Sequence, residues 1–375
     1  MRIRALLPVL FAAVASAQEK PTPEDETRAG AWHIAVAIVS QIEKTDTKDF
    51  PGLRSWLKDF HAVHAKRGEG EATKAFRPVD SDALVTRNPN WWAAFYEIAP
   101  GDPAVLSLHG LLLLAGGEPQ RAQQLAAIGI QRPGIPDLHR QALRMVMNES
   151  QKAMARANET THTGVRLHDA RDYDGAIKKY DEALALNPSN GWTHYERGFS
   201  IRIRAYVKAG RPVPENGQFI INGNDADLPE EKDVAADFAQ ARLHDPFQFN
   251  AYQGSDKKVI ASILPLHEKI RPVWEQVMQD ATKPLDDGTL LKLAEGCHEV
   301  GIHDYALVTR QILIARRKRY APEDHPIISE HLRALAAGPV VERTIKQLAG
   351  EKMRGLMFVP PEGDAGLLLA PPGGK

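Results

Sequence analysis

The sequence predicts an all-α fold, a stack of antiparallel helix hairpins, and two observations carry this prediction. Apolar residues recur at helical spacing through most of the chain. Small residues also return at a fixed period, since Gly164 and Gly198 take the same place in two successive predicted helices, about 34 positions apart. A period of this size indicates repeated helix pairs that bury a shared core.

The clearest unit lies at residues 172–188. Antiparallel helices approach closely only where side chains are small, so a ring between two small residues fills the gap beside such a contact. The unit has this composition at helical spacing, followed by a helix-ending proline: Ala176, Tyr180, Ala183 and Pro188. It therefore predicts a helix that packs on the preceding helix around Gly164.

This spacing resembles that of the tetratricopeptide-repeat family, closely from Gly164 to Gly198 and more weakly at 103–133, 192–246 and 287–319. The resemblance implies a right-handed α-solenoid whose groove binds peptides and partner proteins. The unequal distances between units predict an irregular array with one long loop insertion. The positions that the repeat uses for packing are Gly110, Ala122, Gly164, Ala176, Tyr180, Ala183, Pro188, Gly198 and Ala306.

Residues 1–17 have the pattern of a secretory signal peptide. Positive residues are followed by an apolar run and by the small residues Ala15-Ser16-Ala17, and the run is too short to span a bilayer stably. We therefore expect an exported protein, periplasmic or extracellular, without a transmembrane anchor. Residues 18–28 are polar and contain prolines, which predicts a flexible N-terminus after cleavage.

The remaining chain divides into N-terminal helical hairpins at 29–100, a repeat array at 101–357 and a Pro/Gly-rich tail at 358–375. Predicted helices at 29–42 and 50–65 are expected to pair as a hairpin. Two short helices at 81–87 and 91–98 follow, separated by Asn88-Pro89, because these residues favour a break.

Within the array, an insertion rich in Gly, Pro and Asn at 210–230, with a possible strand at 219–221, interrupts one unit. Loops of this length inside compact arrays are usually functional or disordered. Helical patterns predict segments at 103–133, 137–157, 157–190 and 192–246, a proline-interrupted helix at 255–282, a pair at 287–319, and capping helices at 327–336 and 340–348.

The family resemblance also implies which first-helix side chains line the groove. Trp, Tyr and Arg are the anchors that binding hot spots favour. Aromatic residues at helical spacing also pack in cores, so Trp192 and Tyr195 have the alternative role of packing on the preceding helix pair. The implied groove positions are Asn158, Thr161, Val165, His168, Trp192, Tyr195, Phe199 and Arg202.

Several side chains with metal-binding or catalytic chemistry are interpreted as structural, so we expect no metal and no cofactor. Cys297 takes an apolar repeat position, which favours a buried small residue over a nucleophile. The loop 222–227 alternates oxygen ligands but has Asp233 where an EF-hand loop has its last Glu. Two histidines three apart make only part of a zinc site. The paired histidines are His61 with His64, His298 with His303, and His325 with His331.

The charge balance and the absence of catalytic motifs limit the classes of function that the sequence favours. Lys+Arg number 47 against 48 Asp+Glu, so no basic field favours nucleic acid, and the run 316–319 sits where a helix end favours positive charge. We find no recognised catalytic motif. The leading interpretation is an exported scaffold that binds a protein or an extended peptide. The alternatives are a secreted hydrolase or carbohydrate-active protein on a helical array, and a purely structural assembly part.

Overall fold

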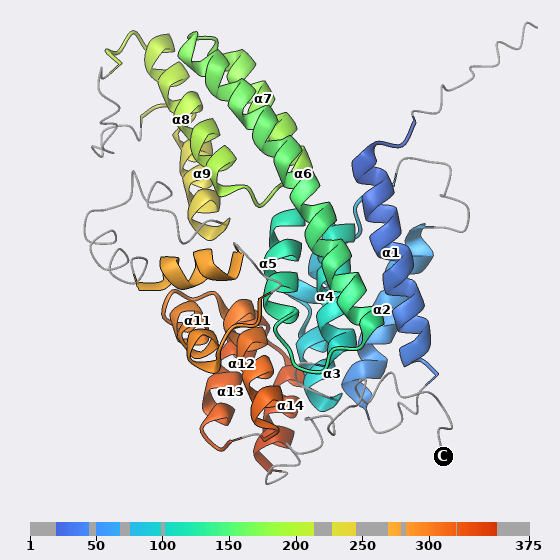
Figure 1. The fold of residues 1–375 in the computed structure, drawn as a ribbon. Coiled ribbons are helices and arrows are strands. Elements are labelled where there is room, and N and C mark those ends of the chain that lie inside the picture. The colour runs from blue at the N-terminus through green and yellow to red at the C-terminus, as the bar shows by residue number, and fades with distance from the viewer. Residues whose placement is uncertain are drawn as a thin grey trace, which may run out of the picture.

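The computed structural model is helical throughout the part that it describes, and this part contains no strand. From residue 103 to 244 and from residue 287 to 350, helices that follow one another along the chain pack side by side, as expected of an irregular helical solenoid. Figure 1 shows a body, formed by the helices within residues 23–129 and 287–350, and an arm, formed by the second half of the long helix at 137–169 with the helices within residues 173–244. The described residues are 20–44, 50–67, 76–98, 102–213, 227–244, 269–278, 283–319 and 321–350.

The first helix begins earlier than expected, because α1 spans Pro23–Ile42 and so includes much of the segment 18–28. Thr22 Oγ1 accepts the N–H of Asp25 at 3.2 Å, and the Asp25 carboxylate accepts the N–H of Thr22 at 2.9 Å. This capping box satisfies N–H groups that a helix start leaves open, and a proline at the first helical position needs no such partner. The proline that suggested a flexible segment is therefore part of a helix-start signal.

The expected hairpin of the first two helices is replaced by a different pairing. Helix α1 packs mainly along α4 (Pro103–Ala115), and α2 (Pro51–Arg67) packs along α3 (Pro89–Ile98). The reason is an aromatic cluster between α2 and α3, in which the Trp91 ring lies 4.4 Å from Phe95 and 5.4 Å from Trp56, centroid to centroid. The short π-helical turn η2 (Asp82–Thr86) precedes α3.

Helices α4 and α5 (Pro119–Gly129) form the first repeat-like hairpin of the body. Gly117 has φ +79° in the turn between them, a conformation that favours glycine. Every residue of α4 is buried, and a Cβ at Gly110 would lie 3.3 Å from Val146 of α6 (Asp137–Asp169). The repeat position Gly110 is therefore a close helix contact, and Ala122 is fully buried.

A single helix, α6 (Asp137–Asp169), replaces the two expected segments that met at Ala157. It leaves the body and forms the first helix of the arm (Figure 1). Helix α7 (Tyr173–Leu186) packs back on it, and α8 (Gly191–Lys208) and α9 (Glu231–His244) form the second pair. The pairing of α8 with α9 across the insertion follows the predicted spacing.

Close packing in the arm occurs at the predicted small residues. A Cβ at Gly164 would lie 2.5 Å from the Tyr180 ring, and one at Gly198 would lie 3.0 Å from Asp237 Cβ. Ala176, Tyr180 and Ala183 have no exposed surface, and Ala306 of the body is 1% exposed. Pro188 is exposed, and its carbonyl accepts a hydrogen bond from His194 at 2.9 Å.

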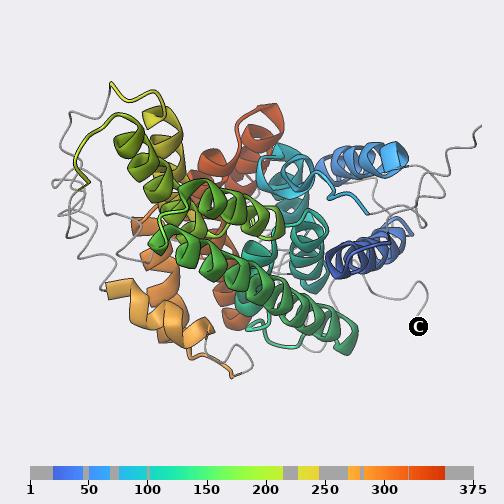
Figure 2. The same cartoon turned by 90° about the horizontal axis from the view of Figure 1, so that it is seen from above.

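The C-terminal helices fold back onto the N-terminal half. Helix α12 packs on α5, and α14 packs on α3, so the expected capping helices lie against the helix at 89–98 (Figure 2). Arg316 Nη2 donates to the Gln131 carbonyl at 2.9 Å, and Arg121 faces Asp304 at 3.5 Å. These helices are α11 (Asp287–Glu299), α12 (His303–Arg317), α13 (Asp324–Leu335) and α14 (Pro339–Gly350), preceded by a helical segment at 269–278.

The core follows the division into body and arm. One large apolar cluster extends through the body from α1 to α14 and includes the first turns of α6. A small cluster of Ile201, Val234 and Phe238 holds α8 to α9 in the arm. Several predicted segments lie outside the described residues: the signal peptide at 1–17, the strand at 219–221, loop residues 222–226, Pro246, Pro265 and the tail at 358–375.

Candidate partner-binding surface

The first helices of the two arm repeats lie in register. Asn190 Nδ2 donates to Asn158 Oδ1 at 3.0 Å, and the hydroxyls of Thr161 and Thr193 are 2.7 Å apart. A third pair follows along the same line, since His168 Nδ1 lies 2.7 Å from Ser200 Oγ. These contacts fix α8 beside α6 and align their side chains on one face.

Four rings form a continuous series on this face, which we call the aromatic ladder: Tyr195, Phe199, His168 and Tyr173. Successive ring centroids lie 6.3, 5.3 and 5.3 Å apart, from α8 across α6 to α7. All four side chains are partly exposed. The ladder therefore offers solvent an apolar surface held rigid by ring contacts, which suits recognition because little side-chain freedom is lost on binding.

Trp192 continues the face beyond the ladder. Its ring contacts exposed His162 of α6 edge to face at 4.8 Å, and its Nε1 donates to Glu196 Oε1 at 3.0 Å. The carboxylate of Glu196 also lies in the electrostatic field of Asp169 on α6. Aromatic rings and carboxylates from both helices thus share one surface.

Burial shifts the titration of groups on this face. It raises the pKa of Tyr195 to about 12 and raises the pKa of Glu196, where the Trp192 hydrogen bond opposes and Asp169 adds to the shift. Burial also lowers the pKa of His168. A neutral His168 can accept a hydrogen bond from the Ser200 hydroxyl at its Nδ1.

The structure differs from the expected groove set at Thr161 and Arg202. Thr161 is fully buried, and its hydroxyl forms hydrogen bonds with the Thr193 hydroxyl and the Ala157 carbonyl. The Arg202 side chain is 1% exposed, forms an ion pair with Glu231 of α9, and lies 5.3 Å above the Phe238 ring. Neither side chain faces solvent, because both hold helices together. The expected positions on the partly or fully exposed surface are Asn158, Val165, His168, Trp192, Tyr195 and Phe199.

Four residues on this face were missed by sequence reasoning: His162, Asp169, Tyr173 and Glu196. They lie off the four first-helix positions that the family resemblance supplies. Helical spacing could have identified three of them, because residues three or four positions apart lie on the same face of a helix. Glu196 is one turn from Trp192, and both Asp169 and His162 are about one turn from Val165.

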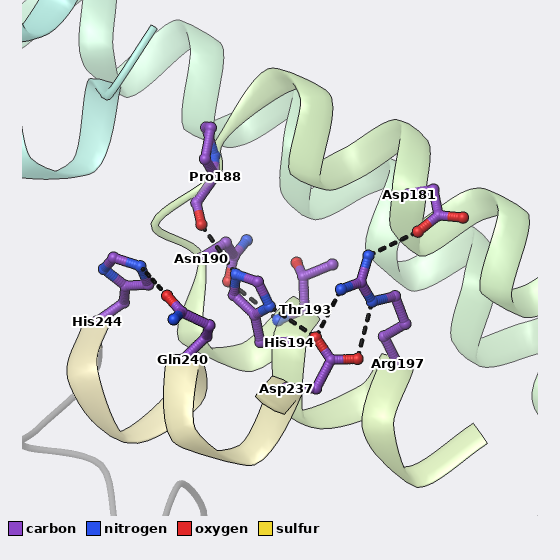
Figure 3. Close-up of polar contacts among 9 residues, drawn as sticks. All are labelled: Asp181, Pro188, Asn190, Thr193, His194, Arg197, Asp237, Gln240 and His244. Atoms are coloured by element: carbon purple, nitrogen blue, oxygen red, sulfur yellow. Dashed lines mark hydrogen bonds and ion pairs between the residues drawn. The ribbon is translucent and has the colours of Figure 1, made fainter. Parts of the chain in front are cut away.

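A polar network on the other side of α8 explains how α9 is held after the insertion (Figure 3). Asp237 of α9 accepts from Arg197 Nε at 2.8 Å and Arg197 Nη2 at 2.7 Å, and from His194 Nδ1 at 2.9 Å. Burial alone would raise the pKa of Asp237, but the His194 and Arg197 hydrogen bonds hold it below its usual value. Arg197 also bonds Asp181 of α7 at 2.7 Å, so the network ties the three helices together.

The other candidate chemistry lies in the body. His298, His303 and His331 come from three helices, and His303 Nδ1 lies 2.9 Å from His331 Nδ1. Within the described residues, no three His, Cys, Asp or Glu side chains form a group that could hold a metal ion. Cys297 is fully buried, and burial raises the pKa of its thiol well above the usual value, so it does not supply a thiolate at neutral pH.

Comparison with known proteins agrees with the geometry of the arm. Residues 164–200 match a family model described as a TPR repeat, so the helices from the end of α6 to α8 contain a tetratricopeptide repeat. No curated protein and no solved structure matches the chain. None of the helices in the described segments is long and apolar enough to cross a membrane. The chain is thus a helical repeat protein of a kind that typically serves as a protein-interaction scaffold.

Proposed function

We propose that this protein is an exported scaffold that binds a partner protein, through an extended segment of that partner, on the α6–α8 face of the arm. The observation that carries the proposal is the aromatic ladder with Trp192 beside it, within a recognised repeat. The four rings and Trp192 are partly exposed although each already packs on a neighbour. A surface of this kind gains free energy when a partner covers the remaining exposed ring area.

Export rests on the pattern of residues 1–17, with positive, apolar and small residues in that order. It is tested by determining the N-terminal residue of the protein recovered from outside the cytoplasm. Cleavage after Ala17 supports export, whereas an intact Met1 on the recovered protein contradicts it.

Binding is tested by comparing captured partners of the unaltered protein with those of Trp192→Ala/Tyr195→Ala. Loss of a hot-spot aromatic costs about 2 kcal/mol or more, so capture is expected to fall strongly. Leu291→Ala is the matched control, because Leu291 is 41% exposed and lies on α11 in the body.

Tyr195 also packs on Phe238, so the double variant is checked by thermal unfolding before capture is compared. His162→Ala supplies a second variant whose side chain is exposed and supports no core contact. Unchanged capture by both folded variants would remove the α6–α8 face from the proposal.

A further inference from the structure

Two carboxylates on the α6–α8 face lack a basic partner. Asp169 is exposed and Glu196 is partly exposed, and in the described part of the chain neither forms an ion pair. Most other acidic side chains of the arm are paired, such as Asp174 with Arg204, Asp181 with Arg197 and Glu231 with Arg202. Within the described residues of the arm, Glu159, Asp172 and Asp233 also form no ion pair, and Glu196 differs from them because it lies beside the Trp192 indole.

These carboxylates act on each other and on a buried hydroxyl. The charge of Asp169 reaches Glu196, and both charges reach Tyr180, whose side chain has no exposed surface. The Tyr180 hydroxyl lies beside Ser200, and a hydrogen bond to Ser200 opposes the rise that burial causes in the pKa of Tyr180.

The surroundings of this region are aromatic. The Trp192 indole is fixed by its bond to Glu196 and by the edge of His162, so its orientation is set before any ligand arrives. A cation near a tryptophan face is attracted by the ring, and a carboxylate beside it strengthens the attraction. Arg166, one turn before Asp169 on the exposed side of α6, donates to Thr163 Oγ1 at 3.0 Å.

We infer that this surface, made by Asp169, Glu196, Trp192 and His162, binds a cationic side chain of the partner, a Lys or Arg within an extended segment. The ammonium or guanidinium group meets the two carboxylates, and its methylene stem lies on the Trp192 ring. The inference rests on the proposed function and adds the charge of the segment that is bound. Charge complementarity selects this occupant over an acidic one, which two unpaired carboxylates would repel.

The test measures binding of short fluorescein-labelled peptides by fluorescence anisotropy at one fixed salt concentration. The probes are a peptide of alternating Lys and Ala, the same peptide with acetylated lysines, and a peptide of alternating Glu and Ala. Acetylation removes the charge and keeps most of the shape. The Lys peptide is expected to bind more tightly than both others.

Glu196→Gln distinguishes binding at this surface from general electrostatic attraction of the Lys peptide to the protein, because glutamine keeps an acceptor for Trp192 Nε1 and removes the charge. It is expected to weaken binding of the Lys peptide about tenfold and to leave the acetylated peptide unchanged. Glu295→Gln changes net charge equally at an exposed site on α11 and is expected to have no effect.

Equal binding of the Lys and acetylated peptides, or equal loss in the two glutamine variants, overturns the inference. The proposed function fails separately. If partner capture depends on Trp192 and Tyr195 but not on Glu196, the scaffold function stands and the cationic segment does not. If capture is independent of Trp192 and Tyr195, the scaffold function falls.

Discussion

Gly164 shows how one residue decides the packing of the arm. The ring of Tyr180 occupies the place where a side chain at this position would begin, 2.5 Å from an ideal Cβ. The contact joins the first and second helices of the recognised repeat. The close approach of the two helices therefore requires a residue without a side chain at position 164. This requirement is visible in the sequence because glycine recurs 34 positions later, at Gly198.

Gly164→Ala is expected to lower the free energy of unfolding by about 1–3 kcal/mol, because the added methyl group overpacks the contact with Tyr180. Thermal or denaturant unfolding measures the change. Gly30→Ala is the control, since Gly30 is exposed in α1 with no atom within 4 Å of its Cβ position. Alanine there is expected to be neutral or to stabilise the helix by up to about 1 kcal/mol. Equal effects at both sites would contradict the contact.

Arg202 is the residue whose role changed most between sequence and structure. Removing it with Arg202→Ala leaves Glu231 without its buried partner and is expected to destabilise the protein by about 3 kcal/mol. Arg333→Ala breaks the exposed pair with Glu342 and is expected to cost less than about 1 kcal/mol. Chemical denaturation measures the free energy of unfolding of both variants and tests the expected difference. A stable Arg202→Ala protein would show that the guanidinium has another role.

At the scale of elements, the spacing of small and aromatic residues predicted α6 to α9 because these contacts lie within neighbouring helices. It did not predict that α6 is continuous, since the repeat phase suggested a boundary at Ala157 while the chain has no proline between Pro136 and Pro188. The pairing of α14 with α3 and of α12 with α5 was also not predicted. Contacts between distant segments leave no periodic signal within either helix.

The candidate site was predictable to the same extent. Trp192, Tyr195, Phe199 and His168 were found because they take repeat positions on first helices. The burial of Arg202 depends on Glu231, which the insertion separates from it along the chain. Glu196 lies one turn away from a repeat position. Its place on the shared face depends on how α6 and α8 are positioned relative to each other, which the sequence does not give.

Substitution of Asp237 tests whether its hydrogen bonds hold α9 against the rest of the arm. Asp237→Asn is expected to weaken the bonds to Arg197 and His194 and to speed amide hydrogen exchange in α8 and α9, with little change in α4. Asp181→Asn removes only a partner of Arg197 that is 56% exposed and is expected to have a small effect. Exchange that changes equally in α4 and α9 would show that the arm does not open separately from the body.

At the scale of the whole molecule, buried histidines predict sensitivity to acid. Burial is the main cause that lowers their pKa values from 6.5, to about 3 for His109 and to about 4 for His139, His244 and His331. The unfolded chain binds these protons more readily, so the stability they contribute is complete above pH 6.5 and is lost as the pH falls toward 4. Asp102 acts in the opposite direction between pH 6 and 3.8, because burial raises its pKa to about 6.

The free energy of unfolding is therefore expected to fall between pH 6.5 and 4, since these four histidines and His168, whose pKa burial also lowers, outnumber Asp102 and Glu196, whose pKa values burial raises. Denaturant unfolding at a series of pH values measures the slope. His331→Gln, which removes one of the four groups, is expected to reduce that slope. A slope that His331→Gln does not alter would contradict the assignment.

The central claim is that the α6–α8 face of the arm contacts a partner, and site-specific photocrosslinking tests it most directly. A photoreactive phenylalanine analogue replaces His162 in one protein and Leu291 in another, and each is illuminated with the exported fraction of the source cells. The account predicts a discrete crosslinked adduct from position 162 and none from position 291. Equal adducts from both positions, or an adduct from position 291 alone, would contradict it.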